Sequence, residues 1–234
     1  MRAGFPLLTT KKVYWKHAVT ELLWILQGRT DLDYLHQHGL KYWDPDYVRS
    51  GRTDNTLGPV YGHQLRNFGG YDQLKELLIQ IKDNPSSRRL MASLWNPNDL
   101  GDMALPPCHY GFQVYINDGV IDLMWNQRSV DVFLGLPYDI SMYALLLLML
   151  AKGSGYKPGQ LIANLGDCHL YTEHKKAAKE QLSRDQRDLP NVEVMFGLSY
   201  IGGITNSIVM DTHETIKLID YDPHPPIKAK LLVG

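Results

Sequence analysis

The strongest constraint on the fold is a β-hairpin pattern in the middle of the chain. Residues 110–116 and 120–125 have strand patterns, and Asn117-Asp118-Gly119 separates them. Such a turn sequence between two strand patterns favours an antiparallel hairpin. Helix patterns precede and follow the hairpin without a regular strand–helix alternation. The sequence therefore predicts a single α+β domain and not an alternating parallel fold.

Further helices and strands are expected on both sides of the hairpin. Apolar residues at three- and four-residue spacing predict helices, and short apolar runs bounded by turn residues predict strands. The expected helices cover residues 12–27, 30–38, 74–81 and 137–152, and one more follows Thr172; the expected strands cover 90–95, 160–165 and parts of 191–218. Residues 41–62 are polar and rich in turn formers, which is typical of a ligand-facing loop.

The bulk composition disfavours several classes of protein. The chain has 234 residues and a formal net charge of −1, so it shows no basic excess for a nucleic-acid polymer. Cys108 and Cys168 do not make a disulfide framework, and residues 1–6 lack the apolar core of a signal peptide. We therefore expect a cytoplasmic protein. The apolar run 145–150 is too short to span a membrane and predicts a buried helix.

Cys108 is the most distinctive candidate for chemistry. It follows Pro106 and Pro107 directly and precedes the first strand of the hairpin. The two prolines hold the preceding chain extended and stiff, so a thiol at this point can be aimed. On this stretch alone, a buried small hydrophobe and a reactive thiolate both remain open.

A metal site and a cysteine hydrolase are the alternatives to a thiol nucleophile of another kind. His169 and His174 are five residues apart, which does not suit metal binding from one helix face, and we expect no metal.

A cysteine hydrolase would need a histidine base. His109 adjoins Cys108 in a strand, where neighbours point to opposite faces. The base would have to be His169, His174 or His224, and none of them carries a local signature.

Charged side chains elsewhere suggest an anionic ligand. Arg88 and Arg89 follow two serines at the entrance of a strand, where they can be solvated or can hold a phosphate. Glu21 lies within the apolar face of the first helix, and a carboxylate buried there needs a partner.

Long motifs make the chain similar to the thymidylate synthase family. The resemblance runs from about Gly4 to Lys228, so we treat residues 1–234 as one catalytic domain of that type. Its motifs are Gly4-Phe5-Pro6-Leu7-Leu8-Thr9-Thr10-Lys11, Glu21-Leu22-Leu23-Trp24, Gly58-Pro59-Val60-Tyr61-Gly62, Ser87-Arg88-Arg89, Pro107-Cys108-His109, residues 127–137, Gly166-Asp167-Cys168-His169-Leu170-Tyr171 and Tyr221-Asp222-Pro223-His224-Pro225.

The resemblance implies a reaction and an assembly. Cys108 would add to ring carbon C6 of a pyrimidine nucleoside monophosphate, which makes C5 a nucleophile toward the one-carbon group of 5,10-methylenetetrahydrofolate. The fold would be a mixed β-sheet packed with helices, and one face of the sheet would form a homodimer interface. Arg88 and Arg89 would reach the phosphate in the partner subunit.

The resemblance also assigns roles to individual positions. Arg128 would lie beside the thiolate, lowering its pKa, and beside the phosphate. The expected catalytic residues are Cys108, Glu21, Tyr61, Arg128 and Asp139. The expected nucleotide-binding residues are Arg88, Arg89, Gln127, Arg128, Ser129 (phosphate), Asp139, and His169 with Tyr171 (sugar 3′-hydroxyl). The expected folate-binding residues are Lys11, Trp43, Asp131, Leu134, Gly135 and Tyr138.

Asp139 is the sharpest departure from the family pattern, which has asparagine here. An asparagine amide supplies the acceptor and donor that match uracil N3–H and O4. An ionised aspartate offers acceptors only, so it suits the N4 amino group of cytosine and opposes uracil O4. Mismatched buried polar groups of this kind discriminate by roughly 10⁴. Within the family, deoxycytidylate hydroxymethylases share an aspartate at this position.

Other departures concern access of water to the site. The family's phosphate-binding Arg-Thr-Gly loop would precede Gly4, and residues 228–234 differ from the family's closing tail. Asp46 stands where an aromatic residue often contacts the pterin ring. We expect these changes to give a wetter site, in which water replaces hydride as the final nucleophile.

We therefore expect hydroxymethylation of deoxycytidylate (dCMP) by methylenetetrahydrofolate, with an ordered water near Glu21. The alternatives within the family are methylation of deoxyuridylate (dUMP), a C5 methylase acting on dCMP or CMP, and a CMP hydroxymethylase. A regulator that binds nucleotide or RNA and a cysteine hydrolase are the alternatives from other classes.

Overall fold

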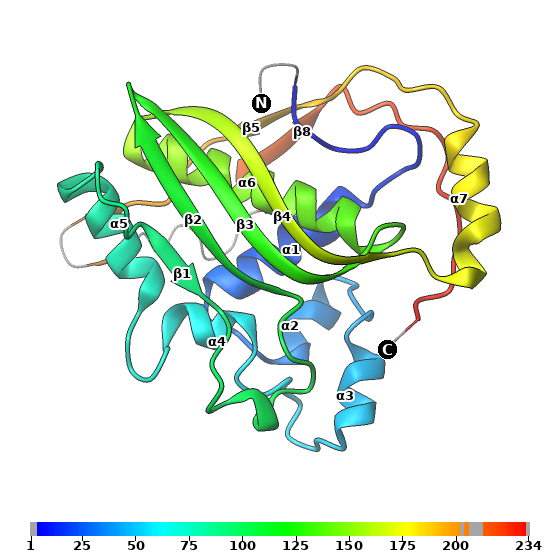
Figure 1. Ribbon diagram of the computed structural model, residues 1–234, viewed down its shortest axis with the longest axis horizontal. Coiled ribbons are helices and arrows are strands. Elements are labelled where there is room, and N and C mark those ends of the chain that lie inside the picture. Colours follow the sequence, from blue (N-terminus) through cyan, green and yellow to red (C-terminus); the bar gives the residue numbers. More distant parts are fainter. Residues whose placement is uncertain (1–3, 202–203, 206–212, 233–234) are drawn as a thin grey trace.

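The computed structural model describes residues 4–201, 204–205 and 213–232 of the chain (Figure 1). Its helices are α1 (Trp15–Leu26), α2 (Leu32–Gln37), α3 (Asp44–Ser50), α4 (Tyr61–Arg66), α5 (Gln73–Asp83), α6 (Gly135–Ser154) and α7 (Lys175–Leu182). Its strands are β1 (Met91–Ser93), β2 (His109–Asn117), β3 (Val120–Asp131), β4 (Lys157–His169), β5 (Asn191–Val194), β6 (Tyr200–Ile201), β7 (Ile204–Thr205) and β8 (Ile216–Ile219). Leu100–Asp102, Thr172–His174 and His213–Thr215 form 3₁₀ turns.

A mixed sheet with the strand order β1-β2-β3-β4 is the centre of the fold. β2 pairs antiparallel with β1 and β3, whereas β3 and β4 are parallel. The β2–β3 connection turns at Asp118 and Gly119, whose φ angles are both positive (49° and 75°). This is the backbone of a two-residue hairpin turn, which an Asp-Gly pair adopts readily. The predicted hairpin and the α+β class are confirmed.

One face of the sheet is covered by α6 and α1. The parallel pair β3–β4 requires a crossover, and α6 supplies it. Figure 1 shows α6 and α1 behind β3 and β4, and the two helices pack against each other. Leu145, Leu147 and Leu150 of α6 have no exposed surface. Each buried leucine contributes roughly 2 kcal/mol, so the helix predicted to be buried is a main part of the core.

Among the described residues, α6 is long and apolar enough to cross a membrane, and 61% of the tested stretch is buried inside the structure. Its contacts with α1, β3 and β4 account for that burial. The composition of α6 is therefore explained by its place in the core.

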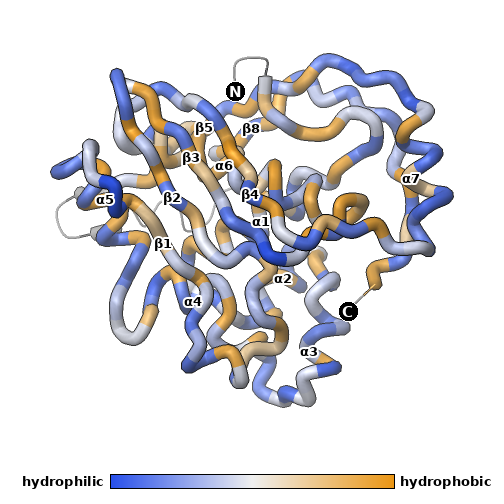
Figure 2. Tube along the Cα trace, in the orientation of Figure 1, coloured by the Kyte–Doolittle hydropathy of each residue, from blue (hydrophilic) through white to orange (hydrophobic). Residues whose placement is uncertain are grey.

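The opposite face of the sheet carries no helix in Figure 1. Met91, Gln113, Met124 and Ile162 are register partners across its four strands. Met91 is 55% exposed and Ile162 is 39% exposed. Figure 2 shows hydrophobic and hydrophilic positions alternating along these strands. This face is available to a second subunit, and its use as a dimer interface stays a prediction.

The expected loop at residues 41–62 is wrong in part, because it contains α3 and the start of α4. Pro45 stands at the beginning of α3, and Gly51 ends it in the left-handed conformation. These are ordinary helix-end signals. Apolar periodicity did not predict α3, because the buried residue of this helix, Asp46, is charged and not apolar.

Several predicted bounds also need correction. β3 runs on through the polar residues 126–131, because β4 pairs with it there, and β4 extends to His169. Of the strand expected at 90–95, only Met91–Ser93 (β1) forms. Thr172 makes no side-chain cap and begins a 3₁₀ turn, and α7 starts at Lys175. Residues 191–218 do contain strands, but 202–203 and 206–212 lie outside the described residues.

Candidate active site

The Cys108 backbone is held from two sides. Its N–H donates to the Tyr61 hydroxyl at 2.9 Å, and its carbonyl accepts from the Arg128 N–H at 2.8 Å. These bonds join the residue before β2 to the start of α4 and to β3. Cys108 is partly exposed. The structure therefore confirms that the backbone of Cys108 is held at the start of a strand, and the reactivity of its thiol stays a prediction.

Burial dominates the electrostatics of this thiol. Burial raises the pKa of Cys108, while the Arg128 cation and a hydrogen bond from the Tyr61 hydroxyl lower it. The predicted effect of Arg128 has the right direction, but the effect of burial outweighs it. The Arg128 guanidinium donates to the carbonyls of Pro107 (2.9 Å) and Pro106 (3.0 Å). The cation is thus fixed beside the thiol by the two prolines.

His109 supports the site from the core. Its ring stacks on Tyr61 with centroids 4.4 Å apart, and its Nδ1 lies 2.8 Å from the Tyr143 hydroxyl. Burial lowers the pKa of His109 to about 3, so the imidazole is neutral. The residue is buried, and its ring contacts Tyr61 and Tyr143. His109 is therefore not the base of a cysteine hydrolase.

The three histidines that could serve as the base of a hydrolase each lie within hydrogen-bond distance of a backbone carbonyl. His174 Nε2 lies 2.9 Å from the Lys230 carbonyl, and His224 Nε2 lies 3.0 Å from the Asp185 carbonyl. His169 Nδ1 lies 3.3 Å from the Asp167 carbonyl. Within the described part of the chain, no group of three or more His, Cys, Asp or Glu side chains could hold a metal ion.

Glu21 has the partners that its position demanded. Trp43 Nε1 donates to Glu21 Oε1 at 2.9 Å, and the Tyr42 hydroxyl also bonds to this carboxylate. Burial raises the pKa of Glu21, and these two bonds lower it. The Trp43 ring lies 6.0 Å from that of Tyr61. The structure thus links Glu21 to Cys108 through two aromatic residues. Sequence reasoning missed Tyr42, whose only signal was its place beside Trp43.

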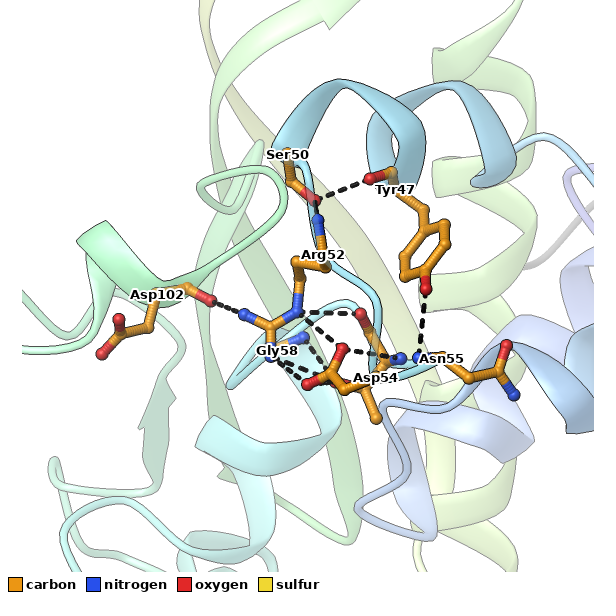
Figure 3. Close-up of polar contacts among 8 residues, drawn as sticks. Tyr47, Ser50, Arg52, Asp54, Asn55, Gly58 and Asp102 are labelled. Carbon is orange, nitrogen blue, oxygen red and sulfur yellow. Dashed lines mark hydrogen bonds and ion pairs between the residues drawn. The ribbon is translucent and has the colours of Figure 1, made fainter.

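The loop leading to Tyr61 is locked by Arg52 (Figure 3). Its guanidinium donates to the Asp102 carbonyl at 2.8 Å, to Asp54 Oδ1 at 3.1 Å and to the Thr56 carbonyl at 3.0 Å. A Cβ on Gly58, whose φ is +77°, would lie 2.1 Å from the Asp102 carbonyl oxygen. Only glycine fits there, and it fixes the direction from which the chain enters α4.

Asp139 belongs to an ordered hydrogen-bond chain. Trp125 Nε1 donates to Gln127 Oε1 at 3.1 Å, and Gln127 Nε2 donates to Asp139 Oδ2 at 2.7 Å. An indole N–H can only donate, so it fixes which end of the Gln127 amide faces Asp139. Burial raises the pKa of Asp139 to about 7, against the lowering effect of Gln127.

The parallel register of β3 and β4 brings Ser129 and His169, two of the expected nucleotide residues, to the same end of the sheet. Ser129 pairs with Asp167, and Asp131 pairs with His169. The rings of His169 and Tyr171 pack edge to face with centroids 5.0 Å apart. These polar side chains therefore share one end of the sheet, next to Arg128.

The expected folate residues gather where β3 ends and α6 begins. Asp131 Oδ1 accepts from the backbone N–H groups of Phe133 (2.9 Å) and Leu134 (3.0 Å), directly before Gly135. Lys11 Nζ lies 3.5 Å from the centre of the Phe133 ring and donates to the Phe133 carbonyl. Burial lowers the pKa of Lys11 to about 8, while Asp131 raises it.

Tyr138 continues this region on the first turns of α6. Its hydroxyl accepts from the Tyr14 N–H at 3.4 Å. Trp43, the remaining expected folate residue, precedes α3, is buried and contacts Glu21 and Tyr61. The folate role of all these residues is a prediction.

Arg88 and Arg89 lie apart from the thiol of their own chain. Both are exposed and precede β1. Met91 is opposite Gln113, and β2 runs from Gln113 back toward Cys108. At 3.4 Å per residue, the two arginines are roughly 20 Å along the strand from Cys108.

Comparison with known proteins agrees with this arrangement. Residues 1–233 match the family model described as thymidylate synthase. The chain is 45% identical over 243 aligned residues to a protein of Escherichia phage T5 named "Probable thymidylate synthase", and the match covers 99% of this chain and 86% of that protein. Because the family model covers nearly the whole chain and the relative is 45% identical over 99% of it, this chain belongs to the thymidylate synthase family.

Proposed function

We propose that this protein transfers the one-carbon unit of methylenetetrahydrofolate to C5 of dCMP and releases 5-hydroxymethyl-dCMP and tetrahydrofolate. Family membership supports the general reaction, a folate-dependent one-carbon transfer to C5 of a pyrimidine nucleotide. The choice of base and of product is the proposal, and it treats the whole chain as one catalytic domain.

The first step uses the Cys108 thiolate. It adds to C6 of the base, and C5 becomes an enamine-like nucleophile that attacks the one-carbon group. Arg128 stabilises the thiolate, because it is the cation that acts on this sulfur. Glu21, whose pKa is raised by burial, moves protons around C5 together with Tyr61. Ser129, His169 and Tyr171 hold the phosphate and the sugar.

The observation that carries the cytosine assignment is the contact between Gln127 and Asp139. The Gln127 amide presents N–H to residue 139, so the nearer side-chain atom there must accept. In an asparagine the other atom would then be an N–H donor, which suits uracil O4. In an ionised aspartate the other atom is an acceptor, which suits the N4 amino group of cytosine.

The product depends on which nucleophile completes the reaction. After tetrahydrofolate departs, an exocyclic methylene remains on the base. Hydride from tetrahydrofolate would give a methyl group and dihydrofolate, whereas water gives a hydroxymethyl group. A polar site favours water, and Asp46 makes the wall beside Trp43 more polar than an aromatic residue would. An ordered water near Glu21 is part of this proposal.

The comparisons favour a second candidate, the methylation of dUMP. The phage T5 relative is named a probable thymidylate synthase and aligns with nearly the whole chain. A protonated Asp139 could serve uracil, because its hydroxyl can donate to O4, and the pKa of about 7 allows this form near neutrality. The methylation of dCMP or CMP and the hydroxymethylation of CMP are further outcomes that the same assay separates.

We also propose a homodimer that uses the uncovered face of the sheet. Arg88 and Arg89 lie far along the strand from Cys108 of their own chain, so a phosphate at Cys108 would need arginines from a second subunit. The row of Met91, Gln113, Met124 and Ile162 offers a partly apolar surface for that contact.

The test is a substrate profile with product identification. Purified protein is incubated with methylenetetrahydrofolate and dCMP, CMP, dUMP or UMP, and nucleotide products are identified by chromatography and mass. The proposal predicts 5-hydroxymethyl-dCMP without dihydrofolate absorbance. Turnover of dUMP with none of dCMP would refute the base assignment, and dihydrofolate formed from dCMP would refute the product.

A further inference from the structure

The C-terminal segment, residues 221–232, is held near its end by His174. Figure 1 shows this segment in red, running beside α7 toward the C-terminus. The Arg184 guanidinium, just after α7, donates to the Pro225 carbonyl at 2.6 Å. Just before α7, His174 Nε2 lies 2.9 Å from the Lys230 carbonyl. A carbonyl oxygen can only accept, so His174 Nε2 carries a proton and donates it to this bond.

The second ring nitrogen of His174 is buried without a partner. The His174 side chain is 1% exposed, and Nδ1 makes no hydrogen bond among the described residues. Asp131 Oδ1 is 4.0 Å from Nδ1, which is within ion-pair range but too long for a hydrogen bond. A buried polar atom without a partner is costly. An imidazolium can satisfy both sides at once, because it donates from each nitrogen.

The carboxylate near His174 belongs to the expected folate region. Asp131 Oδ1 accepts from the backbone N–H groups of Phe133 and Leu134. The His174 ring contacts the Phe133 ring, with centroids 5.4 Å apart. Lys11 Nζ lies 3.5 Å from the centre of the Phe133 ring, and Asp131 raises the pKa of Lys11. His174 therefore packs against the turn that joins β3 to α6, where a basic group and a carboxylate already meet.

His174 is fixed by its own turn and not by the C-terminal segment. It ends the 3₁₀ turn Thr172–His174, and its N–H donates to the Tyr171 carbonyl at 2.9 Å. Its ring also packs edge to face with that of Tyr171, with centroids 5.6 Å apart. The ring is thus anchored to the end of β4, and its two nitrogens lie near two different parts of the chain.

We infer that His174 is a positioning residue that couples the C-terminal segment to Asp131. This role rests on the proposed function, in which Asp131 binds the folate. Nε2 holds the Lys230 carbonyl, and a protonated Nδ1 holds Asp131 Oδ1 after a shift of about 1 Å. Ordering of the C-terminal segment thereby favours the folate-binding position of Asp131, and bound folate steadies the segment in return.

The test is a double-mutant cycle of His174→Phe and Asp131→Asn in the full chain. Phenylalanine keeps an aromatic ring in this place and removes both nitrogens. His38→Phe is the matched control, because His38 Nδ1 also lies 2.8 Å from a backbone carbonyl, that of Tyr34, and its ring packs on the same residue. Melting curves verify that each variant is folded, and His174→Gln serves if phenylalanine prevents folding.

Two properties are measured for each variant. Trypsin cleaves after the exposed Lys230 and releases residues 231–234, so the rate of this cleavage, followed by mass, reports how firmly the segment is held. Steady-state kinetics give kcat and the KM values for methylenetetrahydrofolate and for whichever nucleotide the wild type converts.

We expect His174→Phe to speed the cleavage after Lys230 about tenfold and to raise the KM for methylenetetrahydrofolate about tenfold. The KM for the nucleotide should stay close to the wild-type value. Asp131→Asn should also raise the folate KM, and the double variant should resemble Asp131→Asn, because the coupling acts through this carboxylate. His174→Gln, which keeps one N–H donor and loses the other, should raise the folate KM too. His38→Phe should behave like the wild type.

The contrary outcomes separate this role from the proposed function. Unchanged cleavage in His174→Phe, an unchanged folate KM, or effects of the two substitutions that simply multiply would overturn the coupling alone. A folate KM that Asp131→Asn leaves unchanged would overturn the folate role of Asp131 and the coupling with it. A wild type that converts another base or forms another product would overturn the proposed reaction, while the measured coupling would stand.

Discussion

Gln127 Nε2 donates a hydrogen bond to Asp139 Oδ2 at 2.7 Å, and the direction of this bond cannot be reversed. Trp125 Nε1 holds the carbonyl end of the Gln127 amide, so the amide nitrogen must face Asp139. In the proposed function, the second side-chain atom of residue 139 faces the base, and whether it donates or accepts depends on the residue being asparagine or aspartate. One substitution at this position should then change the choice of base.

Replacing Asp139 by asparagine should reverse the base preference. The second atom becomes an N–H donor, which matches uracil O4 and opposes the N4 amino group of cytosine. We expect the ratio of kcat/KM for dCMP to that for dUMP to fall about 1,000-fold. Steady-state kinetics with both nucleotides check this. An unchanged ratio in a folded Asp139→Asn variant would show that this residue does not read the base.

The base preference should depend on pH. The pKa of Asp139 is raised to about 7, so the carboxyl is mostly protonated below pH 7 and ionised above it. Uracil O4 needs the protonated form, whereas cytosine N4–H is accepted by the ionised form. The ratio of kcat/KM for dCMP to that for dUMP should therefore rise throughout the range from pH 6 to 8, by up to about tenfold per pH unit.

The matched control for the pH dependence is Asp139→Asn, which has no titrating group at this position. Its ratio should be flat over the same range. A ratio in the wild type that falls with rising pH would contradict the assignment of the acceptor role to the ionised carboxylate.

Trp125→Phe should weaken the choice of base without removing activity. The ring keeps its stacking on Tyr143, whose centroid is 5.2 Å away, but the N–H that orients Gln127 is lost. The Ser129 carbonyl, which accepts from Gln127 Nε2 at 3.1 Å, is then the remaining group that orients the amide, and we expect base discrimination to fall about tenfold. Kinetics with dCMP and dUMP measure this. The Tyr143→Phe variant, which keeps the indole N–H, should retain the discrimination.

Two inactive variants should complement each other if the site is shared between subunits. Cys108→Ala lacks the nucleophile, and Arg89→Ala lacks an arginine that we assign to the partner's site. A mixed dimer has one intact site, so random exchange should restore about a quarter of the wild-type activity. Activity after denaturing and refolding the mixture measures this. Activity no higher than that of the separate variants would contradict the shared site.

Much of the fold was predictable because local signals agreed with it. The Asp118-Gly119 turn fixed the hairpin, and the long apolar pattern predicted α6. The missed helix α3 has end signals but no apolar stripe, so periodicity could not find it. The full length of β3 was also missed, because its polar end is stabilised by pairing with β4 in the fold.

The residues of the candidate site could be predicted from the motifs, but the hydrogen bonds between their side chains could not. The motifs named Cys108, Glu21, Arg128 and Asp139. The missed contacts are the hydrogen bonds from Trp125 to Gln127 and from Gln127 to Asp139, and the bond between Tyr42 and Glu21. They depend on how the helices and strands pack, which the sequence pattern does not show. The net rise in the pKa of Cys108 was missed for a similar reason, because burial of a thiol depends on the whole fold and outweighs the nearby cation.

The most direct test of the account is the initial rate with methylenetetrahydrofolate and either dCMP or dUMP at pH 8, where Asp139 is mostly ionised. Nucleotide products are identified by mass, and dihydrofolate is followed by absorbance. The account predicts conversion of dCMP to 5-hydroxymethyl-dCMP, no dihydrofolate and little turnover of dUMP. Rapid conversion of dUMP to its 5-methyl product with dihydrofolate, and no reaction of dCMP, would contradict it.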